Sequence, residues 1–352
     1  MAALKRFRRQ QQRQVPHLHT ILETSLHGTQ KGMKQIIDLS DYPEKDVIFH
    51  LTGGGFFAHT IAGDVPYLMD WSGTTGAIVI CPEYALLPEH TFPVAINQVT
   101  NVYASIVSGD SANLLGFQTN RVIVTGESTG GNLAAALCVK LCIDGYIDLD
   151  KIMAKKKQER INSSSIDDLD QVENTNTKEH IMQSPNFPKE KKTDVEHNSN
   201  YEVRLPDALM LCCPALDLSL NISPSRVMGT GDPVLPGGLI SAISEAYIPS
   251  YLGENIKKDP VASPYFTPDH ILKLFPPTLL YASSEDPLLD DSVSFNKRLR
   301  DLGVDSDLRA ALNMPHAYWG LGTAGFPEAR KVQQECQAWM VKQFHSHVSV
   351  EK

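Results

Sequence analysis

The chain has 352 residues, of which 42% are hydrophobic, and a formal net charge of −9. This length favours one large domain with inserted segments over two independent domains. The acidic charge disfavours nucleic acid as a partner, because neutralising phosphates requires a basic face.

The N-terminal segment, 1–30, is basic and has no acidic residue before Glu23. We expect a disordered leader, with a transit peptide or a contact with anionic lipid as the alternatives. It lacks the apolar core of a secretory signal peptide. No apolar run in the chain approaches the roughly 20 residues that span a bilayer, so no transmembrane segment is predicted.

Seven stretches have the apolar, β-branched character of buried strands: 34–39, 46–51, 77–84, 121–126, 208–214, 277–282 and 307–312. They lack strict alternation and are separated by helical segments, which predicts an α/β fold with a mostly parallel central sheet flanked by helices. The domain built on this sheet is expected to cover 31–344, followed by a polar tail, 345–352.

Three glycines, Gly53, Gly54 and Gly55, follow the second of these strands. Consecutive glycines permit positive φ angles and a close approach of backbone N–H groups to a ligand. Taken alone, the loop has a flexible turn as its alternative explanation. Phe56 and Phe57 come next, and they are candidates either for the wall of an apolar pocket or for the core.

Ser128 lies in the sequence Gly126-Glu127-Ser128-Thr129-Gly130, between a valine-rich strand and an apolar helical pattern. A serine between close glycines at such a turn is typical of a nucleophile elbow, which holds the hydroxyl above the sheet. The free N–H groups of the following helix would face a developing oxyanion. That helix is expected to bury one stripe against the sheet, formed by Leu133, Leu137 and Leu141.

Two stretches interrupt the domain. Residues 151–203 are rich in charged residues and serine and have too little apolar surface to offset the entropy of ordering, so a disordered insertion is expected. Residues 216–262 have no strand pattern, but apolar residues recur every four positions, which predicts a helix in a lid over the carboxyl ends of the strands. The recurring residues are Leu235, Leu239, Ile243 and Tyr247.

A serine nucleophile needs a base, and in one large group of hydrolases the chain order is serine, acid, histidine. Asp286 precedes a proline, which disfavours the helical conformation and keeps its carboxylate in the loop after a predicted strand. Of the twelve histidines, three follow Asp286, and two of these lie near the polar C-terminus. His316 is therefore the candidate base, although a lone loop histidine is more often a surface residue.

The six cysteines have no spacing typical of a metal site. Cys212 and Cys213 are adjacent in a predicted strand, so we expect their side chains to point to opposite faces and not to pair. This usage indicates a reducing compartment, and hence a cytoplasmic protein, peripheral to lipid surfaces if the basic leader binds them.

With these residues placed, the chain resembles the hormone-sensitive lipase family of α/β-hydrolases, especially its eukaryotic branch. Beyond Ser128, Asp286 and His316, the resemblance rests on five segments: 83–93 (EYALLPEHTFP), 223–226, 232–236, 263–269 and 286–291 (DPLLDD). It covers about Asp46 to Phe344, apart from the insertion. It implies an α/β-hydrolase fold with a helical lid.

The resemblance also implies a serine hydrolase that cleaves carboxylic esters, as carboxylesterases and acylglycerol lipases do. Ser128 would attack, His316 would move the proton, and Asp286 would orient the imidazole. The oxyanion hole would be formed by the backbone at Gly53, Gly54, Gly55 and Thr129. The substrate, a small-molecule or lipid ester, would lie in a pocket lined by Phe56, Phe57 and Tyr318. No metal or organic cofactor is implied.

Three positions depart from the family's motifs. Thr52 replaces the histidine of HGGG, Thr129 replaces the alanine of GDSAG, and Ala317 replaces the glycine after the catalytic histidine. None of these changes removes a catalytic group. They leave a catalytically weak or inactive ligand-binding receptor on the same fold as the alternative function, against which the presence of His316 argues.

Overall fold

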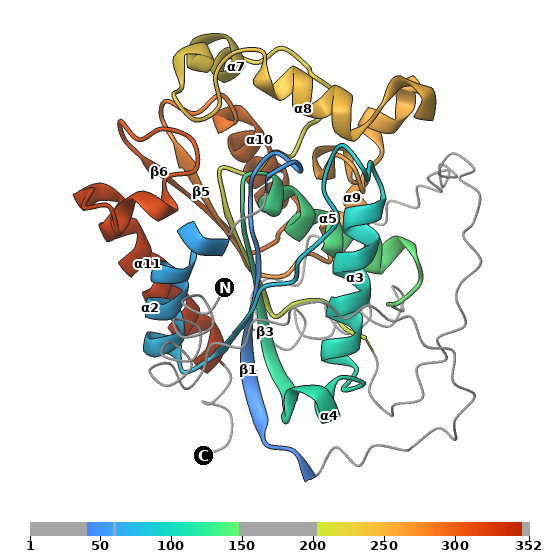
Figure 1. Cartoon of the computed structure of the whole chain (residues 1–352), viewed down its shortest axis with the longest axis vertical. Coiled ribbons are helices and arrows are strands. Elements are labelled where there is room, and N and C mark those ends of the chain that lie inside the picture. The colour runs from blue at the N-terminus through green and yellow to red at the C-terminus, as the bar shows by residue number, and fades with distance from the viewer. Residues whose placement is uncertain (1–40, 59–60, 148–202, 347–352) are drawn as a thin grey trace, which may run out of the picture.

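A computed structural model describes three ranges of the chain, 41–58, 61–147 and 203–346 (Figure 1). The basic leader 1–30, the predicted strand 34–39 and nearly all of the 151–203 insertion lie outside these ranges. Of the predicted tail, 345–352, only His345 and Ser346 lie inside them, and the last helix ends at His345.

A six-stranded parallel sheet forms the centre of the structure, in the order β2-β1-β3-β4-β5-β6. The strands are β1 (Glu44–Leu51), β2 (Ile78–Ile80), β3 (Gln118–Glu127), β4 (Ala208–Cys212), β5 (Thr278–Ser283) and β6 (Ser306–Ala311). The predicted parallel sheet is confirmed, and so are the six predicted strands within the described ranges. β2 is shorter than the predicted 77–84, because Pro82 has no N–H to extend the pairing.

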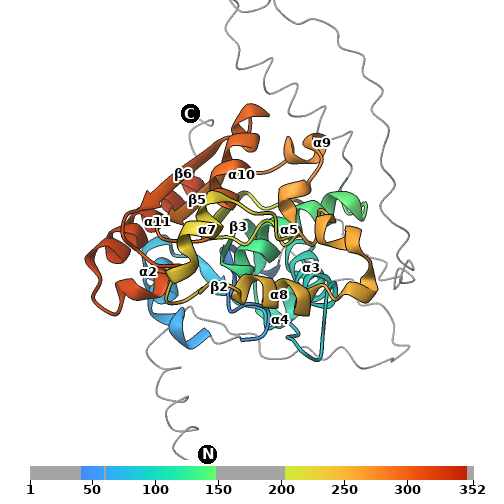
Figure 2. The ribbon, with the colours of Figure 1, turned by 90° about the horizontal axis from the view of Figure 1, so that it is seen from above.

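Helices cover both faces of the sheet (Figures 1 and 2). One face is covered by α2 (Val65–Thr75) and α11 (Pro327–His345), and the other by α3 (Val94–Val107), α5 (Thr129–Ile143) and α10 (Leu289–Asp301). In β1, Ile48 belongs to the first core and Val47 and Phe49 to the second. Burial on both faces explains why the strands read as apolar runs without alternation.

The remaining helices are short: α4 (Ala112–Leu115), α7 (Pro224–Met228), α8 (Leu239–Tyr247), α9 (Asp269–Leu272) and the 3-10 turns η2 (Ile61–Gly63), η4 (Gly229–Gly231), η5 (Ser250–Leu252), η6 (Glu254–Lys258), η7 (Pro264–Phe266) and η8 (Trp319–Gly322). Within the described ranges, no helix is both long and apolar enough to cross a membrane.

The helix after Ser128, α5, is buried on nearly all sides, so the prediction of a single buried stripe was too narrow. Every residue of α5 except Lys140 and Ile143 is buried. The helix is enclosed by the sheet, α3, α9 and η7. Three consecutive alanines, 134–136, keep it slim enough to fit between these neighbours.

Segment 216–262 carries α7 and α8 and lies across the end of the molecule where β3 leads into α5 (Figures 1 and 2). The predicted helix is present as α8, but it begins at Leu239, so Leu235 lies in the preceding loop. Ile243 and Tyr247 are buried, as their four-residue spacing predicts.

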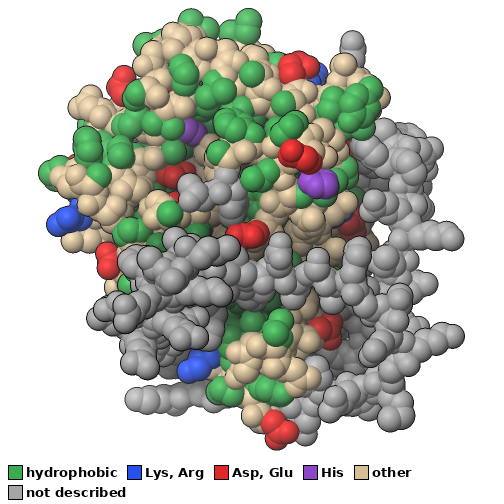
Figure 3. All heavy atoms as spheres, viewed as in Figure 1, with side chains coloured by type: hydrophobic (Ala, Val, Ile, Leu, Met, Phe, Trp, Pro, Cys, Tyr) green, Lys and Arg blue, Asp and Glu red, His purple; other side chains and the backbone are tan. Residues whose placement is uncertain are grey.

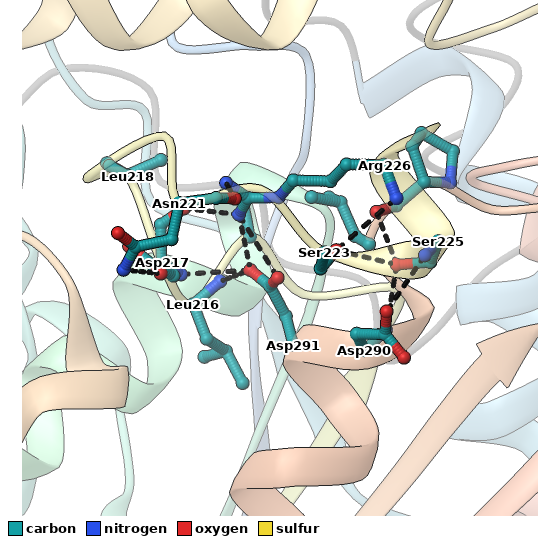
Figure 4. Close-up of polar contacts among 12 residues, drawn as sticks. Leu216, Asp217, Leu218, Asn221, Ser223, Ser225, Arg226, Asp290 and Asp291 are labelled. Atoms are coloured by element: carbon teal, nitrogen blue, oxygen red, sulfur yellow. Dashed lines mark hydrogen bonds and ion pairs between the residues drawn. The ribbon is translucent and has the colours of Figure 1, made fainter. Parts of the chain in front are cut away.

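A buried ion pair anchors this segment to α10 (Figure 4). Arg226 Nη2 lies 3.1 and 3.2 Å from the two carboxylate oxygens of Asp291 and donates to the carbonyl oxygen of Asp217 at 2.6 Å. Asp291 Oδ2 also accepts the N–H groups of Leu216 and Asp217, at 3.1 and 2.9 Å. Burial raises the pKa of Asp291 to about 7, and the Arg226 guanidinium opposes that rise.

Candidate active site

Ser128 lies in the turn between β3 and α5, where its backbone adopts φ 57° and ψ −121°. A positive φ is costly for a residue with a side chain, and such strain is concentrated at functional positions. Backbone hydrogen bonds hold the turn: the Ser128 N–H donates to Cys212 O at 2.9 Å, and Ser128 O accepts from Ala215 N–H at 3.1 Å. This is the geometry that the elbow sequence predicts.

The glycines around Ser128 are required by close contacts. A Cβ atom on Gly126 would lie 2.4 Å from Gly130 O, and one on Gly130 would lie 1.9 Å from the carbonyl oxygen of Leu51, at the end of β1. A Cβ atom on Gly53 would lie 2.7 Å from Glu127 O. The two glycine loops therefore pack directly against each other, which a flexible turn would not explain.

Ser128, His316 and Asp286 come together from three separate loops, and all three side chains are buried. His316 Nε2 lies 2.8 Å from Ser128 Oγ, and His316 Nδ1 lies 3.0 Å from Asp286 Oδ1. An ionised carboxylate only accepts hydrogen bonds, so Nδ1 carries the proton and donates it to Asp286. In the neutral ring Nε2 is then the atom that accepts the Ser128 hydroxyl proton.

Two opposing effects set the pKa of the His316 imidazole. Burial disfavours the charged ring and lowers the pKa, whereas the Asp286 carboxylate stabilises the imidazolium and raises it. The carboxylate, with a smaller contribution in the same direction from Cys213, outweighs burial, so the pKa lies well above 6.5. His316 can accept a proton from Ser128 only once the pH exceeds this raised pKa.

Three backbone N–H groups near Ser128, those of Gly54, Gly55 and Thr129, are candidates for an oxyanion hole. Gly54 and Gly55 adopt φ 120° and 65°, and both border the same cavity as Ser128 and Gly53. Thr129 is the first residue of α5, where a helix N–H has no acceptor within the helix. None of the hydrogen bonds found among the described residues uses the N–H of Gly54, Gly55 or Thr129.

A cavity of about 340 Å³ opens beside Ser128 and His316. The loop after β1 contributes Phe57 and Ala58 to its wall, and segment 216–262 contributes four aliphatic side chains: Val234, Leu235, Leu239 and Ile243. Besides Ser128 and His316, the polar side chains in this lining are those of Thr52, Asp64 and Glu127. The cavity therefore suits an apolar group next to a reacting carbonyl.

Two of the three predicted pocket residues lie elsewhere. Phe57 borders the cavity, but Phe56 turns away and stacks on Tyr247, with ring centroids 3.6 Å apart. Tyr318 is buried in the core on the α2 and α11 side, where its hydroxyl donates to Ala282 O at 3.3 Å. Their apolar character predicted burial correctly, but the direction of each side chain is set by loop geometry.

His50 has a structural position behind the glycine loop. Its Nδ1 lies 2.8 Å from Thr125 Oγ1, and its Nε2 lies 3.3 Å from Asp64 Oδ2 and 3.4 Å from the Tyr67 hydroxyl. These contacts join the end of β1 to β3 and to the start of α2. Thr52, at the family's histidine position, instead borders the cavity.

Glu127 is a site residue that the sequence reasoning missed. It is buried beside Ser128 and borders the cavity, and its Oε1 accepts the N–H of Trp319 at 3.1 Å. Burial, and then the nearby charge of Asp64, raise the pKa of Glu127 to about 7. In the sequence, only its position directly before Ser128 indicated that Glu127 belongs to the candidate site.

We expect Glu127→Gln to stabilise the protein more at pH 8 than at pH 5. The carboxyl ionises near 4.5 when unfolded and near 7 when folded, so its contribution to stability is lost as the pH rises through this window. The gain in free energy of unfolding that the substitution causes should be about 2 kcal/mol larger at pH 8 than at pH 5. Gln keeps an acceptor for Trp319. Urea unfolding of both proteins at each pH tests this, and equal differences would contradict it.

Cys213 does not continue the strand, as the sequence reasoning assumed. β4 ends at Cys212, and Cys213 adopts φ 46°, which brings the two sulfur atoms to 3.9 Å instead of placing them on opposite faces. Sγ of Cys213, a carboxylate oxygen of Asp286 and a ring nitrogen of His316 all lie within 4.8 Å of one another. This set could ligate a divalent cation such as Zn²⁺, in competition with the contact between Asp286 and His316.

The sequence of this chain is similar to esterases and to hormone-sensitive lipases. An esterase of Acinetobacter venetianus is 27% identical over 289 residues, which cover 81% of this chain and 71% of that protein. Hormone-sensitive lipase of Mus musculus is 24% identical over an alignment covering 82% of this chain and 53% of the lipase. This chain thus spans about half the length of that lipase.

Solved esterase structures share the fold. Carboxyl esterase 2 of Tuber melanosporum superposes with a TM-score of 0.64 at 20% identity, over 87% of this chain and 80% of the other. An esterase of Pyrobaculum calidifontis gives 0.60 at 21% identity, over 86% and 78%. Residues 47–182 and 189–320 match a family model described as the alpha/beta hydrolase fold. The predicted fold and resemblance are confirmed, and the chain belongs to the alpha/beta hydrolase fold family, as an esterase- and lipase-type member.

Proposed function

We propose that this protein is a serine hydrolase that cleaves carboxylic esters through Ser128, His316 and Asp286. The observation that supports this most strongly is the continuous pair of contacts, 2.8 Å from Ser128 Oγ to His316 Nε2 and 3.0 Å from His316 Nδ1 to Asp286 Oδ1. Segment 216–262 acts as the lid of the site in this proposal, since its side chains form one wall of the cavity.

In the first half of the reaction, Ser128 Oγ attacks the ester carbonyl carbon while His316 Nε2 takes the hydroxyl proton. Asp286 keeps the ring in the required tautomer and stabilises the imidazolium. The N–H groups of Gly54, Gly55 and Thr129 bind the oxyanion, and each donor contributes about 3 kcal/mol. Gly53 holds this loop against the nucleophile turn.

The imidazolium then gives its proton to the leaving alcohol oxygen, the carbon–oxygen bond breaks, and an acyl-enzyme on Ser128 remains. In the second half, His316 takes a proton from water, and the hydroxide so formed attacks the acyl carbonyl. The bond between the acyl carbon and Ser128 Oγ then breaks, Oγ takes the proton back from His316 Nε2, and the carboxylic acid leaves. Every proton transfer uses His316 Nε2, the ring atom that faces Ser128.

The cavity favours short apolar esters. Its volume of about 340 Å³ is near the lower end of the roughly 300–1,000 Å³ of small-ligand sites. Val234, Leu235 and Ile243 close it on the side of segment 216–262. Long acyl chains would require this wall to move.

Hydrolysis of p-nitrophenyl esters from acetate to palmitate by the purified protein tests the proposal. We expect kcat/KM to be highest for acetate or butyrate and at least about tenfold lower for palmitate, because the cavity is small. The Ser128→Ala protein measures uncatalysed and non-specific hydrolysis. Turnover no greater than that of Ser128→Ala, together with an ester-dependent rise in melting temperature, would favour the receptor alternative instead.

A further inference from the structure

Asp232 joins the wall of the cavity to the backbone of His316. Its side chain is 4% exposed, although it belongs to segment 216–262 and not to the loop of His316. Asp232 Oδ2 accepts the backbone N–H of His316 at 2.7 Å. Asp232 Oδ1 accepts the N–H groups of Val234 and Leu235, at 2.8 and 2.7 Å. One carboxylate thus binds three backbone donors from two segments.

The described residues contain three Asp-Pro turns with the same local geometry. In each, Oδ1 of the aspartate accepts the N–H of the residue two positions later at 2.8 Å; the pairs are Asp232 with Val234, Asp259 with Val261, and Asp286 with Leu288. Asp286 also binds the ring of His316, and Asp232 also binds the backbone of His316. Asp259 makes neither contact. Two of the three turns therefore converge on one histidine.

The backbone of the loop around His316 is strained, so a hydrogen bond from outside the loop, such as that to Asp232, stabilises it. Asn313 and Ala317, on either side of His316, adopt φ 55°, a conformation that side chains disfavour. Strained residues of this kind persist only where surrounding contacts determine them. A charge-assisted hydrogen bond in a buried site is among the stronger of these contacts.

We infer that Asp232 is a positioning residue that couples the cavity wall formed by Val234 and Leu235 to the alignment of His316. The inference rests on the proposed esterase function. Val234 and Leu235, which Oδ1 holds, line the cavity, and Oδ2 holds His316. An acyl chain that pushes this wall outward therefore moves the carboxylate and, with it, the base. The Asp232 turn thus makes kcat depend on the length of the acyl chain, in addition to the effect of chain length on binding.

Asp232→Asn separates the two roles of the carboxylate. Asn has one acceptor oxygen, so its amide group must face either the N–H of His316 or the N–H groups of Val234 and Leu235, and one side loses its bonds. We expect kcat on the butyrate ester to fall by about 10–100-fold, since a small misplacement of a catalytic group has an effect of this size. KM should stay within about threefold of the wild-type value.

Two further readouts distinguish positioning from a general structural effect. The acid limb of kcat/KM should move to lower pH by less than in Asp286→Asn, because the ring keeps its contact with Asp286, and the Cys213 thiol and the Glu127 carboxyl that also act on it are unchanged. The loss in kcat should also increase from acetate to hexanoate, because the longer acyl chain displaces the wall more easily once Asp232 no longer holds it. A purely structural defect would lower the rates of all esters by the same factor.

Asp259→Asn is the matched control, since it changes the same residue in the same Asp-Pro-Val sequence without touching His316. Its kcat should stay within about twofold of wild type. If the wild type is active, an unchanged kcat in Asp232→Asn would overturn the inference. Equal losses of kcat in Asp232→Asn and Asp259→Asn would overturn it as well. An inactive wild type would instead refute the proposed function, and the inference with it.

If Asp232→Asn does not fold, Val234→Ala decides the question, because this side chain is half-exposed and its backbone N–H is retained. A smaller side chain in the wall should raise the hexanoate-to-acetate ratio of kcat several-fold, because the longer acyl chain then pushes less on the segment that Asp232 joins to His316. An unchanged ratio would overturn the inference.

Discussion

Replacing Ser128 with alanine is expected to lower kcat by about 10⁴-fold or more while the protein stays folded. The attacking atom is lost, and the remaining triad members cannot supply it, because they act as a unit with the nucleophile. Alanine fits the strained turn as well as serine does. The lost contact with His316 Nε2 should cost only about 1 kcal/mol of stability. Steady-state kinetics and thermal unfolding measure both effects.

Ser292→Ala provides the control for this substitution. Ser292 is also buried, and its hydroxyl has no hydrogen-bond partner among the described residues, but it lies on α10 and does not border the cavity. It should keep wild-type kcat. A Ser128→Ala protein with wild-type turnover would show that Ser128 is not the nucleophile.

Replacing Asp286 with asparagine is expected to lower kcat by about 10⁴-fold, as loss of the carboxylate does in related triads. Asp286 Oδ1 now accepts from both His316 Nδ1 and the N–H of Leu288, at 3.0 and 2.8 Å. With asparagine, an amide group that faces His316 would favour the tautomer with the proton on Nε2, which cannot take the proton of Ser128.

The same variant should change the pH dependence in a defined direction. The Asp286 carboxylate holds the pKa of His316 well above 6.5, against the effect of burial. Without it, burial would lower that pKa against only the smaller opposing effect of Cys213, so the acid limb of the residual kcat/KM should move to lower pH. A limb that stays in place would show that another group titrates there.

Asp290→Asn is the control for Asp286→Asn. Asp290 lies four residues further on, at the start of α10, and its Oδ2 accepts the N–H of Ser225 at 2.8 Å. It has no contact with His316, so kcat should stay within about threefold of wild type. Comparable losses in both variants would mean that the Asp286 effect is one of folding and not of catalysis.

The features that the sequence predicts well are those set by local chemistry or by chain order. The strained strand-to-helix turn at Ser128 is predictable because such a turn needs glycines, and the structure shows why: Gly126 and Gly130 would each clash with neighbouring backbone if they had side chains. Asp286 and His316 followed from their order after the serine and from the strands before them. The sheet was predicted because its strands are buried on both faces.

The features that the sequence does not predict depend on contacts between distant segments. The hydrogen bond from the His316 N–H to Asp232 Oδ2 joins residues 84 positions apart, and no local sequence pattern indicates it. The direction of Phe56 depends on a loop angle, and so does the position of the Cys213 thiol, since both residues adopt a positive φ. The raised pKa of Glu127 likewise depends on burial and on Asp64, neither of which is visible in the sequence.

The most direct test of the proposed function is the mass of the protein after incubation with a fluorophosphonate, which phosphonylates an activated serine irreversibly. We expect one adduct per chain, located by peptide mapping on the peptide that contains Ser128, with loss of esterase activity in proportion to labelling. His316→Ala should slow labelling by orders of magnitude, because the hydroxyl then has no base. An unlabelled protein, or an adduct on another serine with Ser128 unmodified, would contradict the proposed nucleophile and the mechanism built on it.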